Sequence, residues 1–462
     1  MNGQGKNIVI CCDGTGQSIP VAERAKDLGS ANPGRSNVLR LFDLLVKDSP
    51  YQVCWYDPGI GMIPLLEREQ RTMRWMRNVR DEWLGLGLMD SVGEAYLHLM
   101  EQYEPGDRIF LIGFSRGAFT VRALAGMIRC VGLLRPENRN LLPNARDVYE
   151  NMEQRLRKER GRRRDGVISE KERDREGKEA LAAEFRRRFS RHDDVRVSFL
   201  GVWDTVKAYG YFVPRGFPFT RNNEILDVVR HAVAIDERRS PFQLTGWCDR
   251  IVRTLHLQQD IEEVWFTGDH SNVGGGHRDA DLLAKTAFDW MLGEATAFDL
   301  LVDLDRYEDA TGWDRNASPA ADAKPDDLSR NLGFWLADLL PRRELNNTYF
   351  PPERTWRALS TGDRRPLNHK FPDSEWVRAQ PGGSFPQVVR VHSSAKKRCD
   401  TPTSLPRPFQ DLMDAVANAA SEAKRTSTVP MLSIEWVTTR PPVNASEVLV
   451  QRPVAVGPAS VV

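Results

Sequence analysis

Residues 108–128 read RIFLIGFSRGAFTVRALAGMI and carry three local signals in one short span. The apolar run at residues 109–112 predicts a buried strand, and the run that starts at Ala118 predicts a helix. The turn between them, GFSRG at residues 113–117, matches the G-x-S-x-G pattern, which sets a serine at a strained turn between small residues. Because strand, turn and helix follow in the order that this pattern requires, Ser115 is the candidate nucleophile.

The segments on either side of this span alternate between strand-like and helical patterns. NIVICCDGTG (residues 7–16) and YQVCWYDPGIG (residues 51–61) are apolar runs that end in glycine-containing turns, and residues 91–103 have helical spacing. Two later runs, DVRVSFLGVWDTV (residues 194–206) and IEEVWFTGDHSNVGGG (residues 261–276), resume the strand pattern. This alternation predicts an α/β protein in which a mostly parallel sheet has helices on both faces. Together with the turn around Ser115, it predicts the α/β-hydrolase fold.

The composition of the 462-residue chain is that of an ordinary globular protein, with 40% hydrophobic and 28% charged residues. Lys+Arg (65) and Asp+Glu (64) nearly cancel, so the net charge provides no general attraction for nucleic acid, and no nucleic-acid partner is expected. Six scattered cysteines have no spacing typical of a zinc site, and neither a metal nor an organic cofactor is expected.

The amino terminus shows no charged region followed by a cleavable apolar region, which is the pattern of a signal peptide. The most apolar long stretch, residues 109–134, is interrupted by three arginines and does not have the pattern of a membrane span. We therefore expect a protein that is cytoplasmic as synthesised. Later export by a contact-dependent secretion system is left open by the sequence.

Two parts of the chain depart from the sheet pattern. Residues from about 144 to 194 are rich in Arg, Lys and Glu, which predicts a charged helical insertion. This insertion is interpreted either as a solvated helical hairpin or as a basic arm that contacts anionic lipid or a partner. Pro- and Gly-rich stretches then dominate much of the later chain. The predicted division is a catalytic domain at residues 1–295 and a C-terminal cap or extension, packed on it, at residues 296–462.

A serine hydroxyl is a poor nucleophile at neutral pH, so a histidine must accept its proton and a carboxylate must orient that histidine. In the predicted fold both follow the serine in the chain, each after a later strand. Asp204 follows VSFLGVW and His270 follows VWFTGD, which makes them the candidates. A turn formed by Asp204 with Thr205, and a structural role for His270, are the alternatives. His392, after QVVRV, is the main competitor for the histidine, and His277 is a weaker one.

Backbone N–H groups are also needed to stabilise the negative charge that develops on a substrate oxygen, at a site called the oxyanion hole. Arg116 directly follows the candidate nucleophile and is expected to supply the first N–H. Thr15, in the loop Asp-Gly-Thr-Gly after the first strand, is expected to supply the second, because glycine permits close approach of the backbone. Phosphate binding by this loop is an alternative, but the loop lacks the lysine and the spacing of a P-loop.

Six motifs follow one another along the chain: CCDGTGQ, YDPGIG, GFSRGA, GVWDTV, HAVAIDERR and VWFTGDHSNVGGG. With these motifs, over roughly residues 7–292, the chain resembles the uncharacterised α/β-hydrolase domain family that includes one class of type VI secretion lipase effectors. The resemblance implies an esterase with the triad Ser115, Asp204 and His270, and it implies phospholipids as the substrate class. The family loop usually reads close to HSDVGGG, whereas here Asn272 replaces the acid and Asp269 precedes the histidine.

An aromatic segment at residues 209–219, YGYFVPRGFPF, has the composition of a loop that lines an acyl groove. Packing beneath a cap is the alternative interpretation of this segment. The residues expected to line the substrate are Phe114, Tyr211, Phe212 and Phe217.

The function hypothesis is a serine lipase or phospholipase that forms an acyl-enzyme on Ser115 and acts on a lipid or membrane surface. The resemblance further implies an antibacterial type VI secretion effector with a secretion carrier and an immunity protein as partners. One alternative is a soluble carboxylesterase or thioesterase with the same triad. Another is a catalytically inactive binding protein with the hydrolase fold, which the departure at Asn272 keeps open.

Overall fold

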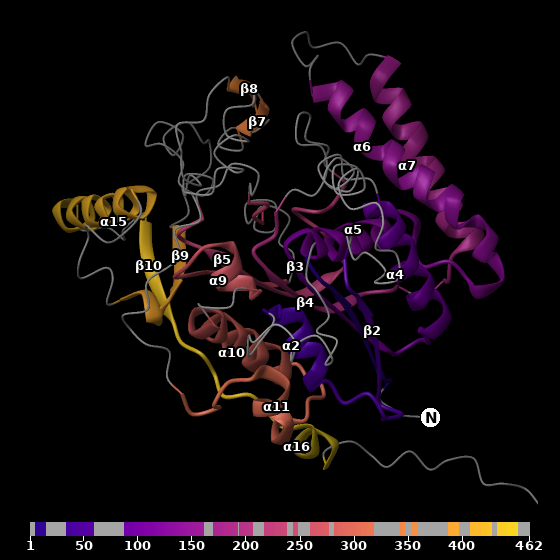
Figure 1. Cartoon of the computed structure of the whole chain (residues 1–462). Coiled ribbons are helices and arrows are strands. Elements are labelled where there is room, and N and C mark those ends of the chain that lie inside the picture. Colours follow the sequence, from indigo (N-terminus) through magenta and orange to yellow (C-terminus); the bar gives the residue numbers. More distant parts are fainter. Residues whose placement is uncertain are drawn as a thin grey trace, which may run out of the picture.

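The computed structural model describes residues 5–14, 34–59, 87–160, 170–192, 194–206, 217–237, 244–247, 259–276, 281–317, 342–346, 353–357, 387–396, 407–426 and 432–450. Within these residues, the centre of the fold is an eight-stranded sheet in the order β10-β9-β6-β5-β4-β3-β1-β2 (Figure 1). Every neighbouring pair in this sheet is parallel. Its strands are β1 (Asn7–Cys12), β2 (Gln52–Asp57), β3 (Arg108–Phe114), β4 (Val197–Trp203), β5 (Leu226–Ala234), β6 (Asp260–Phe266), β9 (Gln387–His392) and β10 (Leu432–Val437).

Alternate side chains of β1 face two different hydrophobic cores. Ile8 and Ile10 pack in one core, and Val9 and Cys11 pack in the other. A strand that is buried on both faces has an almost continuous apolar sequence, which explains the run NIVICC. Helices α4 (Leu88–Gln102) and α5 (Ser115–Val131) pack in the first core, and helices α2 (Asn37–Leu44) and α10 (Asp281–Ala297) pack in the second. The predicted α/β fold, with helices on both faces of a parallel sheet, is confirmed.

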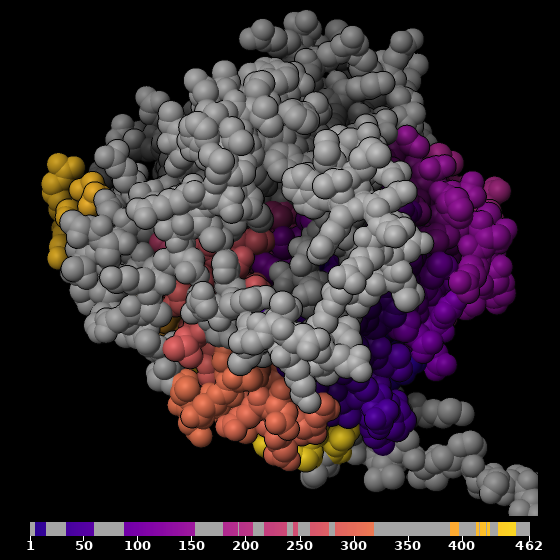
Figure 2. All heavy atoms as spheres, viewed as in Figure 1, coloured from indigo at the N-terminus to yellow at the C-terminus, as the bar shows by residue number. Residues whose placement is uncertain are grey.

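The charged segment after residue 141 forms two helices, α6 (Leu142–Arg160) and α7 (Glu170–Phe189), that extend together away from the sheet (Figure 1). Their bases are anchored in the first core, where Tyr149 donates a hydrogen bond to the carbonyl of Pro218 at 3.0 Å. In the space-filling view this pair of helices forms the flank of the molecule opposite to α15 (Arg407–Thr426) (Figure 2). The predicted helical insertion is therefore present, and its contact with lipid or a partner stays a prediction.

Strands from the later part of the chain extend the same sheet. β9 pairs with β6, and β10 pairs with β9. Their side chains form a separate small core that includes Trp265 and Val391. The division at residue 295 stays a prediction, and any such division passes between strands of one sheet.

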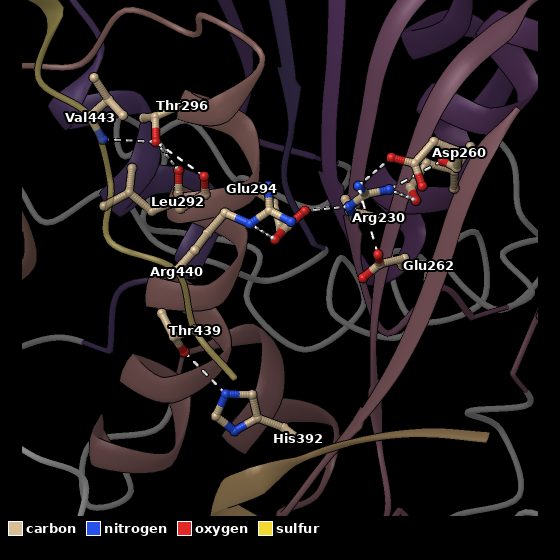
Figure 3. A network of polar contacts seen from close by, with 12 residues as sticks. Arg230, Asp260, Glu262, Leu292, Glu294, Thr296, His392, Thr439, Arg440 and Val443 are labelled. Carbon is tan, nitrogen blue, oxygen red and sulfur yellow. Dashed lines mark hydrogen bonds and ion pairs between the residues drawn. The ribbon is translucent and has the colours of Figure 1, made fainter. Parts of the chain in front are cut away.

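The segment after β10, residues 438–444, returns across α10 and is called the return segment below. Two arginines hold the Glu294 side chain of α10 from opposite sides (Figure 3). Arg440 Nε lies 2.7 Å from one carboxylate oxygen, and Arg230 Nε of β5 lies 2.6 Å from the other. The return segment is thereby linked through α10 to the centre of the sheet.

Shorter elements complete the described part of the chain, and no helix within it is long and apolar enough to cross a membrane. β7 and β8 form an antiparallel pair apart from the main sheet. The remaining helices are α9 (His270–Gly274), α11 (Tyr307–Thr311), α16 (Ala445–Val450) and three 3-10 turns (Pro136–Leu141, Leu304–Arg306, Ser393–Ala395), and the remaining strands are β7 (Arg342–Asn346) and β8 (Glu353–Arg357).

Candidate active site

Ser115 lies at the junction between β3 and α5, in a backbone conformation that is rare for residues other than glycine (φ 57°). Small neighbours are required around it. A Cβ on Gly113 would meet the Cα of Ala118 at 2.7 Å, and a Cβ on Gly117 would meet the carbonyl oxygen of Cys12 at 2.2 Å. The G-x-S-x-G sequence therefore has a steric cause in this turn, as the pattern predicts.

The structure brings the three predicted triad residues together. His270 Nε2 lies 2.8 Å from Ser115 Oγ, and His270 Nδ1 lies 2.5 Å from Asp204 Oδ2. The three side chains follow β3, β4 and β6, whose carboxyl ends lie at the same edge of the parallel sheet. All three are buried, so these contacts are made away from bulk solvent. A hydroxyl, an imidazole and a carboxylate in this series can pass a proton from serine to histidine.

Asp204 is held by the neighbouring strand β5. Its backbone is left-handed (φ 38°), and its N–H donates to the carbonyl of Ala232 at 2.7 Å. Its Oδ1 accepts the N–H of Ala234 at 3.0 Å, which leaves Oδ2 directed at His270. The carboxylate is thus engaged by β5 and His270, and its geometry is that of a residue that orients the imidazole.

The loop that carries His270 contains a capping box at the start of α9. The side chain of Asp269 accepts the N–H groups of Ser271 and Asn272, both at 2.9 Å, and Asn272 Oδ1 accepts the N–H of Asp269 at 3.1 Å. The two residues that depart from the family pattern are therefore partners that fix the start of this helix. The N–H of His270 donates to Glu237 Oε2 at 3.2 Å, which adds a contact from the segment after β5.

His392, the main competitor, lies at the carboxyl end of β9 and is directed elsewhere. Its Nδ1 is 2.9 Å from Ser394 Oγ, and its Nε2 is 3.1 Å from Thr439 Oγ1 of the return segment. The ring stacks on Phe266 with centroids 4.8 Å apart. Burial lowers the pKa of His392 to about 4. The weaker competitor, His277, lies outside the described residues.

The two predicted oxyanion donors have different outcomes. The backbone N–H of Arg116 lies in the first turn of α5, where the helix dipole favours negative charge. Thr15 lies outside the described residues, but Gly14 before it adjoins the nucleophile. A Cβ on Gly14 would lie 3.3 Å from the Cβ of Ser115, so glycine permits this approach.

Asp13 fixes the backbone beside the nucleophile, a role that the sequence reasoning did not assign. Its carboxylate accepts the N–H of Gly14 at 2.6 Å, the hydroxyl of Tyr56 at 2.7 Å, and the hydroxyl of Ser36. Burial raises the pKa of Asp13 to about 6, although the three donors oppose this shift. The available signal in the sequence was an aspartate directly after an apolar run.

The predicted substrate-lining residues are only partly described. Phe114 packs against the His270 ring, with centroids 4.7 Å apart. Phe217 is buried in the core beside Phe119 and Tyr149, which agrees with the alternative of packing for this residue. Tyr211 and Phe212 lie outside the described residues. Within the described part of the chain, no group of His, Cys, Asp and Glu side chains is arranged to hold a metal ion.

Comparisons with known proteins identify the relatives of this chain. An uncharacterised protein of Saccharomyces cerevisiae is 36% identical over 244 residues, which are 52% of this chain and 32% of the yeast protein. A solved structure of the Tle1 effector bound to the VgrG spike from the type 6 secretion system has 18% identity and a TM-score of 0.31, covering 60% of this chain and 52% of that one. An uncharacterised protein from Pseudomonas aeruginosa has 18% identity and a TM-score of 0.34, covering 64% and 47%.

The chain therefore spans about a third of its yeast relative and about half of each solved relative. Residues 6–294 match the family model described as the catalytic domain of Tle1-like phospholipase effectors of the type VI secretion system (T6SS). This match covers more than half of the 462 residues and contains all three candidate triad residues. The chain belongs to the Tle1-like T6SS phospholipase effector family, whose catalytic-domain model matches residues 6–294.

Proposed function

We propose that this chain is a serine phospholipase that hydrolyses carboxylic esters of phospholipids through an acyl-enzyme on Ser115. The observation that carries the proposal is the unbroken series of contacts from Ser115 Oγ to His270 Nε2, at 2.8 Å, and from His270 Nδ1 to Asp204, at 2.5 Å. Family membership supports a hydrolase acting on phospholipid.

The reaction follows from the roles of the three side chains. His270 Nε2 accepts the hydroxyl proton as Ser115 Oγ bonds to the ester carbonyl carbon, and Asp204 stabilises the imidazolium. The tetrahedral intermediate then breaks its bond to the alcohol oxygen, which receives the proton from His270. A water molecule, deprotonated by the same imidazole, attacks the acyl-enzyme and releases the fatty acid. Serine and neutral imidazole are regenerated at the end of the cycle.

The oxyanion is proposed to be stabilised by the backbone N–H groups of Arg116 and Thr15. The position of Arg116 in the first turn of α5 supports the first assignment, because helix N-termini favour negative charge. The close approach of Gly14 to Ser115 supports a donor from the following residue. Asp13 supports this arrangement because it holds the N–H of Gly14 at 2.6 Å.

The test is fatty-acid release from mixed phospholipid vesicles, measured beside hydrolysis of a short soluble ester, for the wild type and Ser115→Ala. We expect release from vesicles that is lost in the variant. Activity on the short ester alone would instead identify a soluble esterase with the same triad. Absence of both activities in a folded wild-type protein would contradict the proposal and favour a binding protein.

We also propose that the protein is delivered by a type VI secretion system, with a carrier and an immunity protein as partners. The family description, which names effectors of this secretion system, supports the delivery, and the carrier and immunity protein follow from the resemblance alone. The test is expression in a bacterium with and without a signal that directs the chain to the periplasm. We expect growth arrest only when the chain is directed to the periplasm and Ser115 is intact. Equal growth of wild type and Ser115→Ala in both compartments would contradict the proposal.

A further inference from the structure

The motif HAVAIDERR begins with a histidine that the proposed mechanism does not use. His231 lies on β5, between β4 and β6 in the middle of the sheet, and its side chain is fully buried. β5 is buried along almost its whole length, so a polar ring at this position has a cost unless both ring nitrogens are paired. The hydrogen-bond partners of the two ring nitrogens show which groups His231 holds in place.

Both nitrogens of His231 have a partner, and the partners fix the tautomer. The backbone N–H of Thr205 donates to Nε2 at 3.1 Å. Because a backbone N–H is always a donor, Nε2 carries no proton and the proton resides on Nδ1. Nδ1 therefore donates to Glu263 Oε2, 3.0 Å away. Burial lowers the pKa of His231, in keeping with a neutral ring.

The N–H that donates a hydrogen bond to His231 belongs to Thr205, the residue directly after Asp204. Asp204 adopts a left-handed conformation (φ 38°), which residues with a side chain disfavour unless their surroundings hold them there. The carbonyl of Thr205 is fixed as well, because it accepts the N–H of Thr245 at 2.8 Å. Thr205, the residue after Asp204, is thus held through both of its backbone polar groups.

The partner of His231 is itself anchored. Glu263 Oε2 also accepts the N–H of Trp247 at 3.1 Å. The Trp247 ring lies against the buried guanidinium of Arg122, 4.3 Å from its carbon. Arg122 belongs to α5, the helix that begins with Ser115, and it donates to the carbonyl of Thr245 at 2.5 Å. A buried polar network therefore runs from the nucleophile helix to the backbone beside Asp204.

We propose that His231 is a positioning residue: its Nε2 accepts the N–H of Thr205 and so holds Asp204 in the conformation that directs Oδ2 at His270. The inference rests on the proposed function, because it concerns the same triad. Loss of this acceptor lets the Asp204 peptide relax from its left-handed conformation, which moves the carboxylate from Nδ1 of His270. The effect belongs to the chemical step and not to substrate binding.

Two conservative variants separate the two ring nitrogens. In His231→Gln the amide oxygen stands as many bonds from Cα as Nε2 does, so it can accept the N–H of Thr205 but loses the bond to Glu263. In His231→Asn the amide nitrogen stands where Nδ1 does, so it can donate to Glu263 but leaves the N–H of Thr205 without its acceptor. Each variant removes one hydrogen bond, and we expect similar losses in Tm.

The experiment measures kcat and KM on the substrate that the wild type hydrolyses and the rate at which a fluorophosphonate probe labels Ser115, well below the lowest Tm. We expect His231→Asn to lower kcat and the labelling rate about tenfold or more with KM unchanged, and His231→Gln to stay within about threefold of wild type. His392→Gln is the matched control, because it removes another buried, paired ring, and its rates should match wild type.

Equal rates in the two His231 variants, whether both near wild type or both reduced in proportion to Tm, would overturn the inference. Hydrogen exchange of the wild-type Thr205 amide covers the case in which His231→Asn does not fold. Slow exchange supports the bond to His231, and exchange at the rate of an exposed amide would overturn it. A wild-type protein that hydrolyses nothing and is not labelled would count against the proposed function itself, so the two failures are distinguishable.

Discussion

His270 and His392 occupy similar places in the fold, but their rings contact different partners. Each is a buried histidine at or just beyond the carboxyl end of a strand, and the two strands, β6 and β9, are neighbours. His270 bridges Ser115 and Asp204 at 2.8 and 2.5 Å. His392 bridges Ser394 and Thr439 and stacks on Phe266.

The order of the strands explains the difference. Ser115 follows β3, and the sheet runs β3-β4-β5-β6-β9, so β9 lies one strand further from the nucleophile than β6. His392 joins β9 to the return segment through its contact with Thr439, whereas His270 contacts the serine that follows β3 and the acid that follows β4. A histidine at the end of a parallel strand is therefore a catalytic candidate only when the strand order brings it to the nucleophile.

The largest expected effect is the contrast between the two histidines as alanine variants. We expect His270→Ala to lower kcat by a factor of about 10⁴ or more, because no group remains to accept the proton of Ser115. His392→Ala should stay within a few-fold of wild type in kcat, although it loses stability. Hydrolysis assays on both variants at a temperature where both are folded measure this. An inactive His392→Ala beside a functional His270→Ala would reverse the assignment.

Two glycine variants extend the comparison to side-chain packing, at Gly274 near His270 and at Gly293 beside the return segment. A Cβ on Gly274 would meet Cε2 of Phe114 at 1.9 Å, and a Cβ on Gly293 would meet the carbonyl oxygen of Arg440 at 2.2 Å. Both Gly→Ala variants should lose about 1–3 kcal/mol of unfolding free energy from overpacking. Only Gly274→Ala should also lower kcat, by about tenfold, since Phe114 packs on His270 and a small displacement of the imidazole is costly.

Urea unfolding measures the first effect of the glycine variants and hydrolysis of the soluble ester measures the second. Gly293→Ala is the control for stability, because its clash involves the return segment. Equal losses of kcat in the two variants would mean that packing at the return segment is transmitted to the triad.

The pH dependence of stability distinguishes His392 from a solvated histidine. Burial lowers its pKa from 6.5 to about 4 in the folded chain, so between these values only the unfolded chain binds the proton. The stabilising contribution is therefore present above pH 6.5 and is lost as pH falls towards about 4, by about 3 kcal/mol in total. His392→Gln should lack this part of the acid destabilisation. Unfolding free energies of the two proteins that fall in parallel between these pH values would contradict it.

The smallest expected effect is at the return segment itself. Arg440 pairs with Glu294, but its side chain is 50% exposed. Arg440→Ala should therefore cost no more than about 1 kcal/mol, and less at high salt, without a change in kcat. Thermal unfolding with and without added salt measures this. A loss of several kcal/mol, or any loss of kcat, would show that the return segment supports the site directly.

The sequence predicted the parts of the site that have local causes. The strand, turn and helix around Ser115 need small residues at Gly113 and Gly117, and that requirement is visible in five letters. Asp204 and His270 follow apolar runs, which predicts their place at the carboxyl edge of a parallel sheet. A hydrogen bond between Asp204 and His270 could be expected from this placement, but its geometry could not.

Most of the parts that escaped prediction depend on contacts between distant segments. The place of β9 next to β6 is set by packing across more than a hundred residues, so His392 could not be rejected from its local pattern. Asn272 keeps an inactive binding protein open as an alternative in the sequence, whereas in the structure its side chain accepts the N–H of Asp269, three residues earlier, in a capping box. His231 contacts the backbone of Thr205, and Asp13 contacts the hydroxyls of Ser36 and Tyr56, so local spacing does not reveal these partners.

The triad is tested most simply by covalent labelling of the folded protein with a fluorophosphonate probe, with the modified peptide identified by mass spectrometry. We expect one adduct on Ser115 in the wild type and in His392→Ala, very slow labelling in His270→Ala, and none at this peptide in Ser115→Ala. Labelling that proceeds equally well without His270, or a wild-type Ser115 that does not react, would contradict the central claim that these residues form a working triad.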